Sequence, residues 1–296
     1  MAEIATVEMK QIRKEFPATL ANDNVDFTAY KGEIHALLGE NGAGKSTLMN
    51  ILTGVLRPDG GEILINGAQV SMKSPGDALA LGIGMIYQHF KLVKPFTVAE
   101  NIVLGMEQVK VLKKQALEQQ VKALSEEYKI DINPASAIWQ LSIGEQQRVE
   151  ILKVLYRRAN ILILDEPTAG LDPRGRDEIL DQIERLHREK KMTIILVSHS
   201  MEDIAKYVDR ILVMNHGEKV FDDTPREVFK HYRELEAIGL AAPQITYVVH
   251  TLRDHGVPID NNITTVEEAR DEILALLKKE GQAARGNGSR GQETIC

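Results

Sequence analysis

A glycine-rich segment between an apolar run and a helical pattern places the strongest constraint on how this chain folds. Residues 39–47 read Gly-Glu-Asn-Gly-Ala-Gly-Lys-Ser-Thr and fit the pattern G-x-x-x-x-G-K-[ST]. The apolar run Ile34–Leu38 comes directly before them, and a helical pattern begins near Lys45. Glycines in this setting let successive backbone N–H groups curl around phosphate oxygens, and the helix N-terminus adds partial positive charge. The sequence therefore predicts a phosphate-binding loop, here called the phosphate loop (residues 39–47).

Side chains at the end of this loop have the chemistry that a nucleotide requires. Lys45 is expected to reach the β- and γ-phosphates, and the Ser46 hydroxyl to bind magnesium. A plain glycine-rich turn is the alternative, which the Lys-Ser pair between strand and helix disfavours. The residues expected to bind nucleotide here are Gly39, Asn41, Gly42, Ala43, Gly44, Lys45, Ser46 and Thr47.

Short apolar runs recur along the chain and indicate the fold class. They lie at residues 34–38, 63–65, 83–86, 161–164, 193–197 and 210–214. Between the last three, apolar residues recur at helical spacing, as at Ile179, Ile183 and Leu186. Strands that alternate with helices favour an α/β fold with a mostly parallel sheet.

Helical patterns replace the strand signals in two regions. From about Phe90 to Tyr156 a capping box at Thr97 and Glu100 and an amphipathic stretch at residues 116–128 predict a helical insertion. Further helical segments follow Asp223, at residues 225–235 and 265–279, and the end is rich in Gly, Arg, Ser and Gln. We therefore expect a main domain at 1–222 with a helical subdomain at about 90–156, a C-terminal appendage at 223–280 and a disordered tail at 281–296.

Composition excludes several classes of protein. The chain has 43 acidic and 36 basic residues and a formal net charge of −7, so no whole-molecule cationic field attracts nucleic acid. The single cysteine is Cys296, which allows no intrachain disulfide. No apolar run approaches the roughly 20 residues of a transmembrane helix, and Met1–Lys10 lacks the order of a signal peptide. A cytoplasmic location without nucleic-acid partners is expected.

Two carboxylates follow the apolar run at residues 161–164. In an α/β sheet the carboxyl end of a buried strand lies at the edge where ligands bind. Asp165 is suited to hold magnesium, and Glu166 to polarise an attacking water as general base. Alone, such a pair is more often a solvated strand end, but the phosphate loop favours a catalytic site.

The segment Leu141-Ser-Ile-Gly-Glu-Gln-Gln resembles the signature sequence of ATP-binding-cassette (ABC) ATPases, usually Leu-Ser-Gly-Gly-Gln. Ser142 and Gly144 match that signature, whereas Ile143 and Glu145 depart from it. The resemblance implies that Ser142 and Gly144 face the γ-phosphate held by the phosphate loop of a second subunit. As local structure, Ser142 with Glu145 also fits an ordinary helix N-cap.

Other positions resemble the family pattern in the same order. Gln88 resembles the glutamine that contacts magnesium and water, and residues 169–172 resemble the D-loop at the subunit interface. His199 resembles the switch histidine at the γ-phosphate, and Phe16 the aromatic ring that stacks on adenine. Each residue alone has a simpler interpretation as loop or core, but their joint order, over residues 1–222, supports the family.

The resemblance implies a P-loop NTPase of the ABC ATPase type. Its fold is a mostly parallel sheet core with N-terminal antiparallel strands and a helical insertion. Its cofactors are ATP and Mg²⁺, and its partners are a second ABC ATPase subunit and transmembrane permease subunits on the inner face of the membrane. Catalysis is assigned to Glu166, His199 and Gln88, and the metal to Ser46, Gln88 and Asp165.

The two halves of the chain resemble different subfamilies. Residues 1 to about 165 look like the ATPases of nucleoside and simple-sugar importers. Residues from about 166 onward look like the ATPases of energy-coupling-factor transporters. This mixture predicts a chimera joined near residues 165–168, and a natural protein with mixed resemblance is the alternative.

We expect an importer ATPase, and two rival functions remain open. One is a non-transport ABC ATPase acting on DNA or ribosomes. The DNA-acting types insert long coiled coils between phosphate loop and signature, whereas Thr47 and Leu141 are only 94 positions apart here. The other is an engineered chimeric domain that folds and binds ATP without coupled transport. The sequence does not name the transported molecule.

Overall fold

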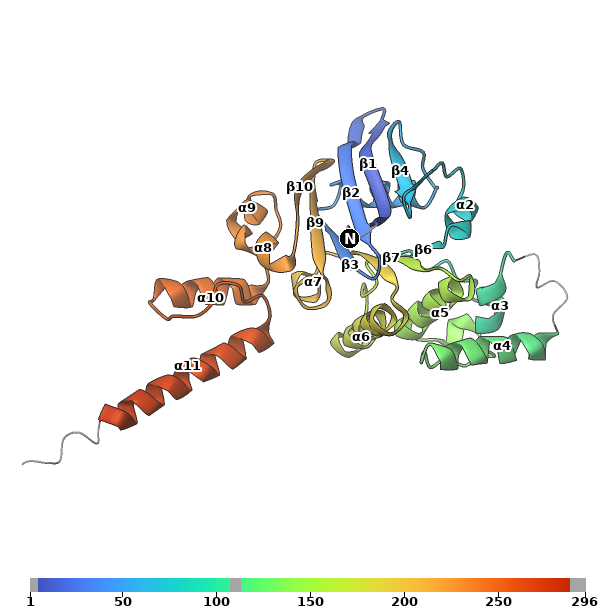
Figure 1. Ribbon diagram of the computed structural model, residues 1–296. Helices are drawn as coiled ribbons and strands as arrows, with labels where there is room; N and C mark the ends of the chain where they lie inside the picture. The colour runs from blue at the N-terminus through green and yellow to red at the C-terminus, as the bar shows by residue number, and fades with distance from the viewer. Residues whose placement is uncertain (1–4, 107–112, 288–296) are drawn as a thin grey trace, which may run out of the picture. The chain divides into compact units, whose positions relative to one another are not determined.

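The computed structural model describes residues 5–106 and 113–287 of the chain (Figure 1). These residues form two compact units. The first comprises the chain up to residue 199 together with residues 207–223, and the second comprises residues 200–206 together with those from 224 onward. The division differs from the expected one because residues 200–206 group with the C-terminal part.

A six-stranded sheet with the order β10-β9-β3-β8-β7-β6 forms the centre of the first unit. Strands β6, β7, β8, β3 and β9 pair in parallel, and β10 is antiparallel to β9. This order confirms the predicted α/β class. The strands are β3 (Ile34–Leu38), β6 (Ile83–Ile86), β7 (Ile161–Asp165), β8 (Thr193–Val197), β9 (Arg210–Asn215) and β10 (Glu218–Asp223).

A second sheet is antiparallel and has the order β2-β1-β4-β5, and its strands come from the N-terminal part of the chain. Its inward residues, such as Met9 and Phe27, share one buried cluster with Met49 and Ile163. The expected N-terminal antiparallel strands are therefore present, and their apolar faces close the core around the phosphate loop. The strands are β1 (Ala5–Phe16), β2 (Thr19–Tyr30), β4 (Gly60–Ile65) and β5 (Ala68–Val70).

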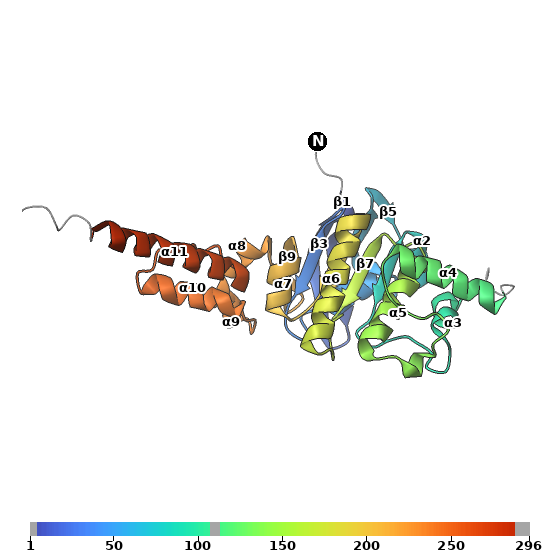
Figure 2. The same cartoon turned by 90° about the horizontal axis from the view of Figure 1, so that it is seen from below.

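Between residues 90 and 156, outside 107–112, the regular elements are helices joined by loops, as predicted, apart from an isolated bridge between Thr97 and Ala137. The capping box at Thr97 is formed: Glu100 Oε2 accepts from the Thr97 backbone N–H at 2.8 Å. Helices α5 and α6 lie side by side, in front of the six-stranded sheet when the molecule is seen from below (Figure 2). The helices of this unit are α1 (Lys45–Leu52), α2 (Pro75–Ala80), α3 (Val98–Val103), α4 (Lys114–Glu127), the 3-10 turn η2 (Ile138–Gln140), α5 (Ile143–Tyr156) and α6 (Pro173–Lys190).

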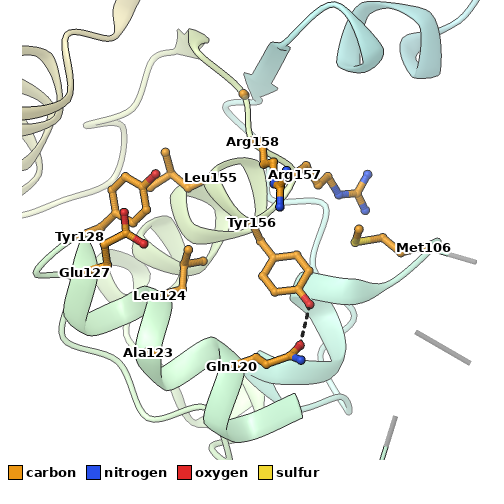
Figure 3. Close-up of a pocket in the computed structure, with 11 residues that line it drawn as sticks. Met106, Gln120, Ala123, Leu124, Glu127, Tyr128, Leu155, Tyr156, Arg157 and Arg158 are labelled. Atoms are coloured by element: carbon orange, nitrogen blue, oxygen red, sulfur yellow. Dashed lines mark hydrogen bonds between the residues drawn. The ribbon is translucent and has the colours of Figure 1, made fainter. Parts of the chain in front are cut away.

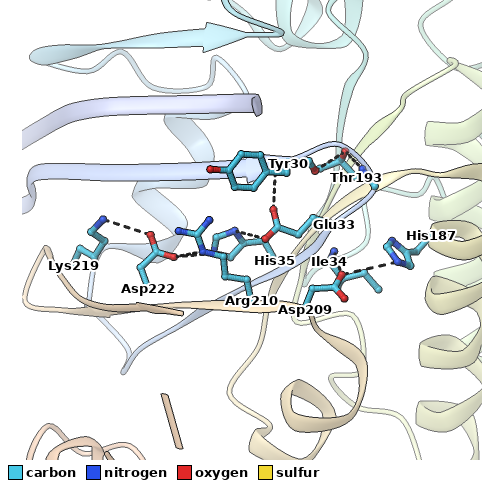
Figure 4. A network of polar contacts seen from close by, with 11 residues as sticks. Tyr30, Glu33, Ile34, His35, His187, Thr193, Asp209, Arg210, Lys219 and Asp222 are labelled. Atoms are coloured by element: carbon cyan, nitrogen blue, oxygen red, sulfur yellow. Dashed lines mark hydrogen bonds and ion pairs between the residues drawn. The ribbon is translucent and has the colours of Figure 1, made fainter. Parts of the chain in front are cut away.

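A polar network fixes the start of β3 (Figure 4). His35 is fully buried, and its ring nitrogens lie 3.8 Å from Glu33 Oε1 and Asp222 Oδ1. Burial, reinforced by the nearby Arg210 charge, lowers the pKa of His35 to about 3, so the imidazole is neutral. Arg210 pairs with Asp222 at 2.7 Å. The network links β3 to β9 and β10 and so helps to hold the strand that leads into the phosphate loop.

The second unit is helical and has a small apolar core of its own, which includes Val249, Ile259 and Ile263. The segment predicted at 225–235 is two helices, because the chain turns at His231. Residues 281–287 were expected to be disordered but continue the last helix. Gln, Ala and Arg at positions 282–285 are good helix formers. Residues 288–296 lie outside the described part. The helices are α7 (Met201–Tyr207), α8 (Pro225–Lys230), α9 (Tyr232–Ala237), α10 (Gln244–Asp254) and α11 (Val266–Asn287).

No helix in the described part of the chain combines the length and apolar composition that a membrane crossing requires.

Candidate functional site

The phosphate loop is pressed against the backbone of two neighbouring strands. Gly44 has φ +101°, and a Cβ there would overlap the carbonyl oxygen of Ala21 in β2. A Cβ on Gly39 would overlap the carbonyl oxygen of Met214 in β9. The buried Asn22 side chain donates to the Gly44 carbonyl at 3.2 Å. Glycine is therefore required at both positions, because the loop backbone approaches these strands more closely than a side chain permits.

Lys45 spans the loop that it ends. Its ammonium donates to the carbonyl oxygens of Gly39 at 2.6 Å and of Glu40 at 2.9 Å, and the residue is only 8% exposed. Burial lowers the pKa of Lys45, and the charges of Glu166 and Asp165 oppose that shift. A cation held by carbonyl oxygens and facing two carboxylates is placed to exchange these contacts for phosphate oxygens.

The two carboxylates lie where β7 ends, beside the end of β8. Burial and the Glu166 charge raise the pKa of Asp165. Glu166 adopts φ +49°, a left-handed conformation that is uncommon for a non-glycine residue, and its backbone N–H donates to the Val197 carbonyl at 2.9 Å. Non-glycine residues in this conformation are often found at functional positions.

Glu166 and His199 meet directly. Glu166 Oε1 lies 2.8 Å from His199 Nδ1, with 14% of the carboxylate side chain and 76% of the imidazole exposed. The two residues are brought together because β7 and β8 are adjacent parallel strands. The structure thus joins two residues that the sequence singled out separately.

Gln88 and Phe16 both lie near the end of a strand. Gln88 is exposed two residues after β6, and Phe16 ends β1 with 38% of its surface exposed. Lys14 Nζ lies 5.5 Å from the centre of the Phe16 ring. An exposed aromatic ring beside a cation offers a face on which a nucleotide base can stack.

The signature segment is formed as an N-cap. The Ser142 hydroxyl donates to Glu145 Oε2 at 2.8 Å and accepts from the Glu145 backbone N–H at 3.3 Å. Hydrogen bonds from the Ser142 backbone and hydroxyl lower the pKa of Glu145, which is therefore charged at neutral pH. The hydroxyl expected to face a phosphate is thus bound to a carboxylate of its own chain.

The signature shares a groove of about 450 Å³ with the segment expected to be the D-loop. Gly144 lines it from the start of α5, and Gly170, Leu171 and Asp172 line it from the segment before α6. Asp172 caps α6 by accepting from the Gly175 backbone N–H at 2.9 Å. The phosphate loop does not line this groove, so two families of candidate residues occupy separate surfaces of the first unit.

Two residues at the site escaped the sequence analysis. Tyr87 is half-buried directly after β6, and its pKa is raised by burial and then by the Asp165 charge. Asn22 is fully buried in β2 beneath Gly44. A polar asparagine at an inward position of a strand is the signal that could have identified it.

A wider cavity of about 1100 Å³ lies between α4 and the end of α5 (Figure 3). The Tyr156 hydroxyl and Gln120 Oε1 are 3.0 Å apart at its edge. Its lining includes none of the predicted site residues, so it is not part of the candidate site.

Residues 22–169 match the family model described as ABC transporter. The nucleoside import ATP-binding protein NupA of Lactococcus lactis subsp. cremoris is 48% identical over 227 residues, which cover 74% of this chain and 44% of NupA. This chain therefore spans less than half of that relative. The energy-coupling factor transporter ATP-binding protein EcfA2 of Clostridium tetani is 39% identical over 266 residues, which cover 87% of this chain and 90% of the relative.

The fold is shared with solved structures. A Clostridium perfringens protein, cbiO1, described as part of the ABC transporter complex cbiONQ, superposes with a TM-score of 0.68 at 28% identity. The match covers 85% of this chain and 100% of that one. The expected α/β cassette with a helical insertion is confirmed.

Proposed function

The chain belongs to the ABC transporter family as an ATP-binding cassette, and we propose that it hydrolyses ATP to drive an importer. The contact between Glu166 and His199 at 2.8 Å carries this proposal. A hydrogen bond across this contact, with the carboxylate as acceptor, has the proton on Nδ1 of His199 and leaves Nε2 available to another partner. Glu166 is the general base that orients water and takes its proton, and Lys45 stabilises the charge of the transferred phosphoryl group.

Mg²⁺ is the cofactor that this donor set fits. In the described part of the chain no three or more His, Cys, Asp or Glu side chains are grouped to hold a metal. A hard cation here relies on few protein oxygens and on the nucleotide phosphates, as magnesium sites commonly do. The Ser46 hydroxyl and the Asp165 carboxylate, with Gln88, are the residues that would hold it. When bound, the metal neutralises phosphate charge.

Two copies of the cassette, or this cassette and a related one, form a head-to-tail sandwich in our proposal. The separation of the signature groove from the phosphate loop supports it, because Ser142 and Gly144 then serve the nucleotide of the other subunit. ATP drives transport by binding the closed dimer better than the open one. Permease subunits receive this change through residues 88–105, which places the chain on the inner face of the membrane.

We also propose that the chain joins segments of two importer subfamilies near residues 165–168. Similarity to both NupA and EcfA2 supports the mixture. The helical insertion then belongs to the nucleoside and sugar type, and the second unit to the energy-coupling-factor type. A natural protein with mixed ancestry is the alternative origin.

The test is ATP-driven uptake in vesicles with a permease of each class, beside ATP binding and hydrolysis by the purified chain. We expect ATP hydrolysis and uptake only with the nucleoside or sugar class, because the helical insertion docks the permease. Efficient uptake with an energy-coupling-factor partner would overturn the docking assignment. Hydrolysis without uptake in either would favour an uncoupled engineered domain or a non-transport ATPase, and absence of ATP binding would refute the site itself.

A further inference from the structure

We infer that Glu150 is a positioning residue for hydrolysis, which ties the loop after Gln88 to the helix that begins with the signature. The inference rests on the proposed ATPase function. Glu150 and Lys153 lie one turn apart on α5, and both reach the same loop residue, Lys91.

Glu150 and Lys153 together bind both backbone polar groups of Lys91, an arrangement called here the Lys91 grip. Glu150 Oε1 accepts from the Lys91 N–H at 2.7 Å, and Lys153 Nζ donates to the Lys91 carbonyl at 3.1 Å. The two gripping side chains also pair with each other, at 3.6 Å between Nζ and Oε2. Because both loop groups are backbone atoms, the grip fixes the path of the chain.

Both side chains that bind the Lys91 backbone are largely removed from water. Glu150 is 5% exposed, and only 16% of the Lys153 side chain is exposed. A carboxylate removed from water is unfavourable unless hydrogen bonds and an opposite charge compensate it. The grip supplies both. Together with Tyr87, these residues line a groove of about 190 Å³.

A second anchor acts two residues further on. Asn101 on α3 is fully buried, accepts from the Val93 N–H at 2.7 Å and donates to the Val93 carbonyl at 3.1 Å. Residues 91–93 are therefore bound to the helical insertion on two sides. Tyr87 instead follows β6 directly and so belongs to the end of the sheet.

The change from sheet to insertion is thereby confined to residues 88–90, which include Gln88. Ser142 and Glu150 are eight positions apart along α5, about 12 Å of helix. A shift of α5 that starts at the signature reaches the Gln88 segment through the Lys91 grip. Glu150 thus makes the placement of Gln88 depend on what Ser142 contacts.

The test compares Glu150→Met, Glu150→Gln and the control Glu118→Met. Methionine has a similar length but accepts no hydrogen bond of this kind, whereas glutamine keeps an acceptor oxygen. Glu118 pairs with Lys114 on α4 of the same insertion. The readouts are the ATP dissociation constant, kcat, and hydrogen exchange of the peptide that contains residues 88–94.

We expect Glu150→Met to leave the ATP dissociation constant within about twofold and to lower kcat about tenfold. Exchange of the 88–94 peptide should accelerate, and Glu150→Gln should recover most of the loss. The control should match the wild type in all three. Should Glu150→Met fail to fold, Lys153→Met removes one of the two backbone contacts and should lower kcat by a smaller factor.

Wild-type kcat in Glu150→Met would overturn the inference, and so would parallel losses of ATP affinity and kcat, which indicate a merely structural role. An equal loss in Glu118→Met would also overturn it. The exchange measurement separates this inference from the proposed function. If the wild type does not hydrolyse ATP, the proposed function fails. The Lys91 grip is refuted independently if residues 88–94 exchange without protection in the wild type, or if their exchange is unchanged in Glu150→Met.

Discussion

The phosphate side and the signature side of this cassette differ in how complete they are within one chain. On the phosphate side, Lys45 is buried, held by two carbonyl oxygens and faced by two carboxylates. On the signature side, Ser142 is exposed and its hydroxyl is bound to Glu145 of the same helix turn. In the proposed function, one side is pre-organised for an anion, whereas the other must first exchange an internal carboxylate for a phosphate.

This difference assigns separate steps to the two sides. Pre-organised groups bind their ligand without a reorganisation step, so our proposal implies that a single chain suffices to hold the nucleotide. A surface that completes a site only in the other subunit makes hydrolysis depend on dimerisation. Variants on the phosphate side should therefore change binding or chemistry outright, and variants on the signature side should change only the dimer.

The largest effect is expected from Glu166→Gln. The amide cannot take a proton from water, so kcat should fall by at least about 100-fold while ATP stays bound. Single-turnover hydrolysis and ATP binding measure the two quantities, with Glu62→Gln, an exposed carboxylate on β4, as the control. Turnover at the wild-type rate would remove Glu166 from the catalytic role.

Lys45→Ala should have the next largest effect. Loss of a charge-assisted hydrogen bond to phosphate should weaken ATP binding by on the order of tenfold to a hundredfold. Titration calorimetry on the isolated chain measures it, and the exposed Lys31→Ala is the matched control. An unchanged dissociation constant would show that the phosphate side is not the nucleotide site.

A mixture of two inactive chains tests the sharing of sites. Ser142→Arg blocks the signature and Lys45→Ala blocks the phosphate loop, so a mixed dimer retains one site with both sides intact. We expect measurable ATPase activity in the mixture above that of either parent. If mixed dimers form by mass spectrometry and stay inactive, each chain must complete its own site.

The smallest effect is expected from Glu145→Gln. Glutamine keeps an oxygen for the N-cap but removes the charge that competes with phosphate for Ser142. ATP-dependent dimerisation, measured by sedimentation in the Glu166→Gln background, should strengthen by a few-fold. Glu126→Gln on α4 is the control, since it changes net charge equally at an exposed position. A weaker dimer would mean that Glu145 supports the interface rather than opposing it.

Local patterns predicted much of the fold. The runs at 34–38, 83–86 and 193–197 are strands with the expected bounds, because β-branched and apolar residues flanked by turns decide strands locally. Local sequence patterns gave the wrong secondary structure in two places. The predicted helix at 225–235 is interrupted at His231. Residues 281–287 form part of a helix, although a composition rich in glycine predicted disorder there.

The sequence by itself determined the phosphate loop, the strand before it, the N-cap at Ser142 and the carboxylates at the end of β7. These follow from backbone conformation and capping, which act over a few residues. Only the tertiary structure decided that His199 meets Glu166, that Asn22 lies beneath Gly44 and that Glu150 grips Lys91. Such contacts depend on strand order and helix packing, which bring distant residues together and set how far each charge is removed from water.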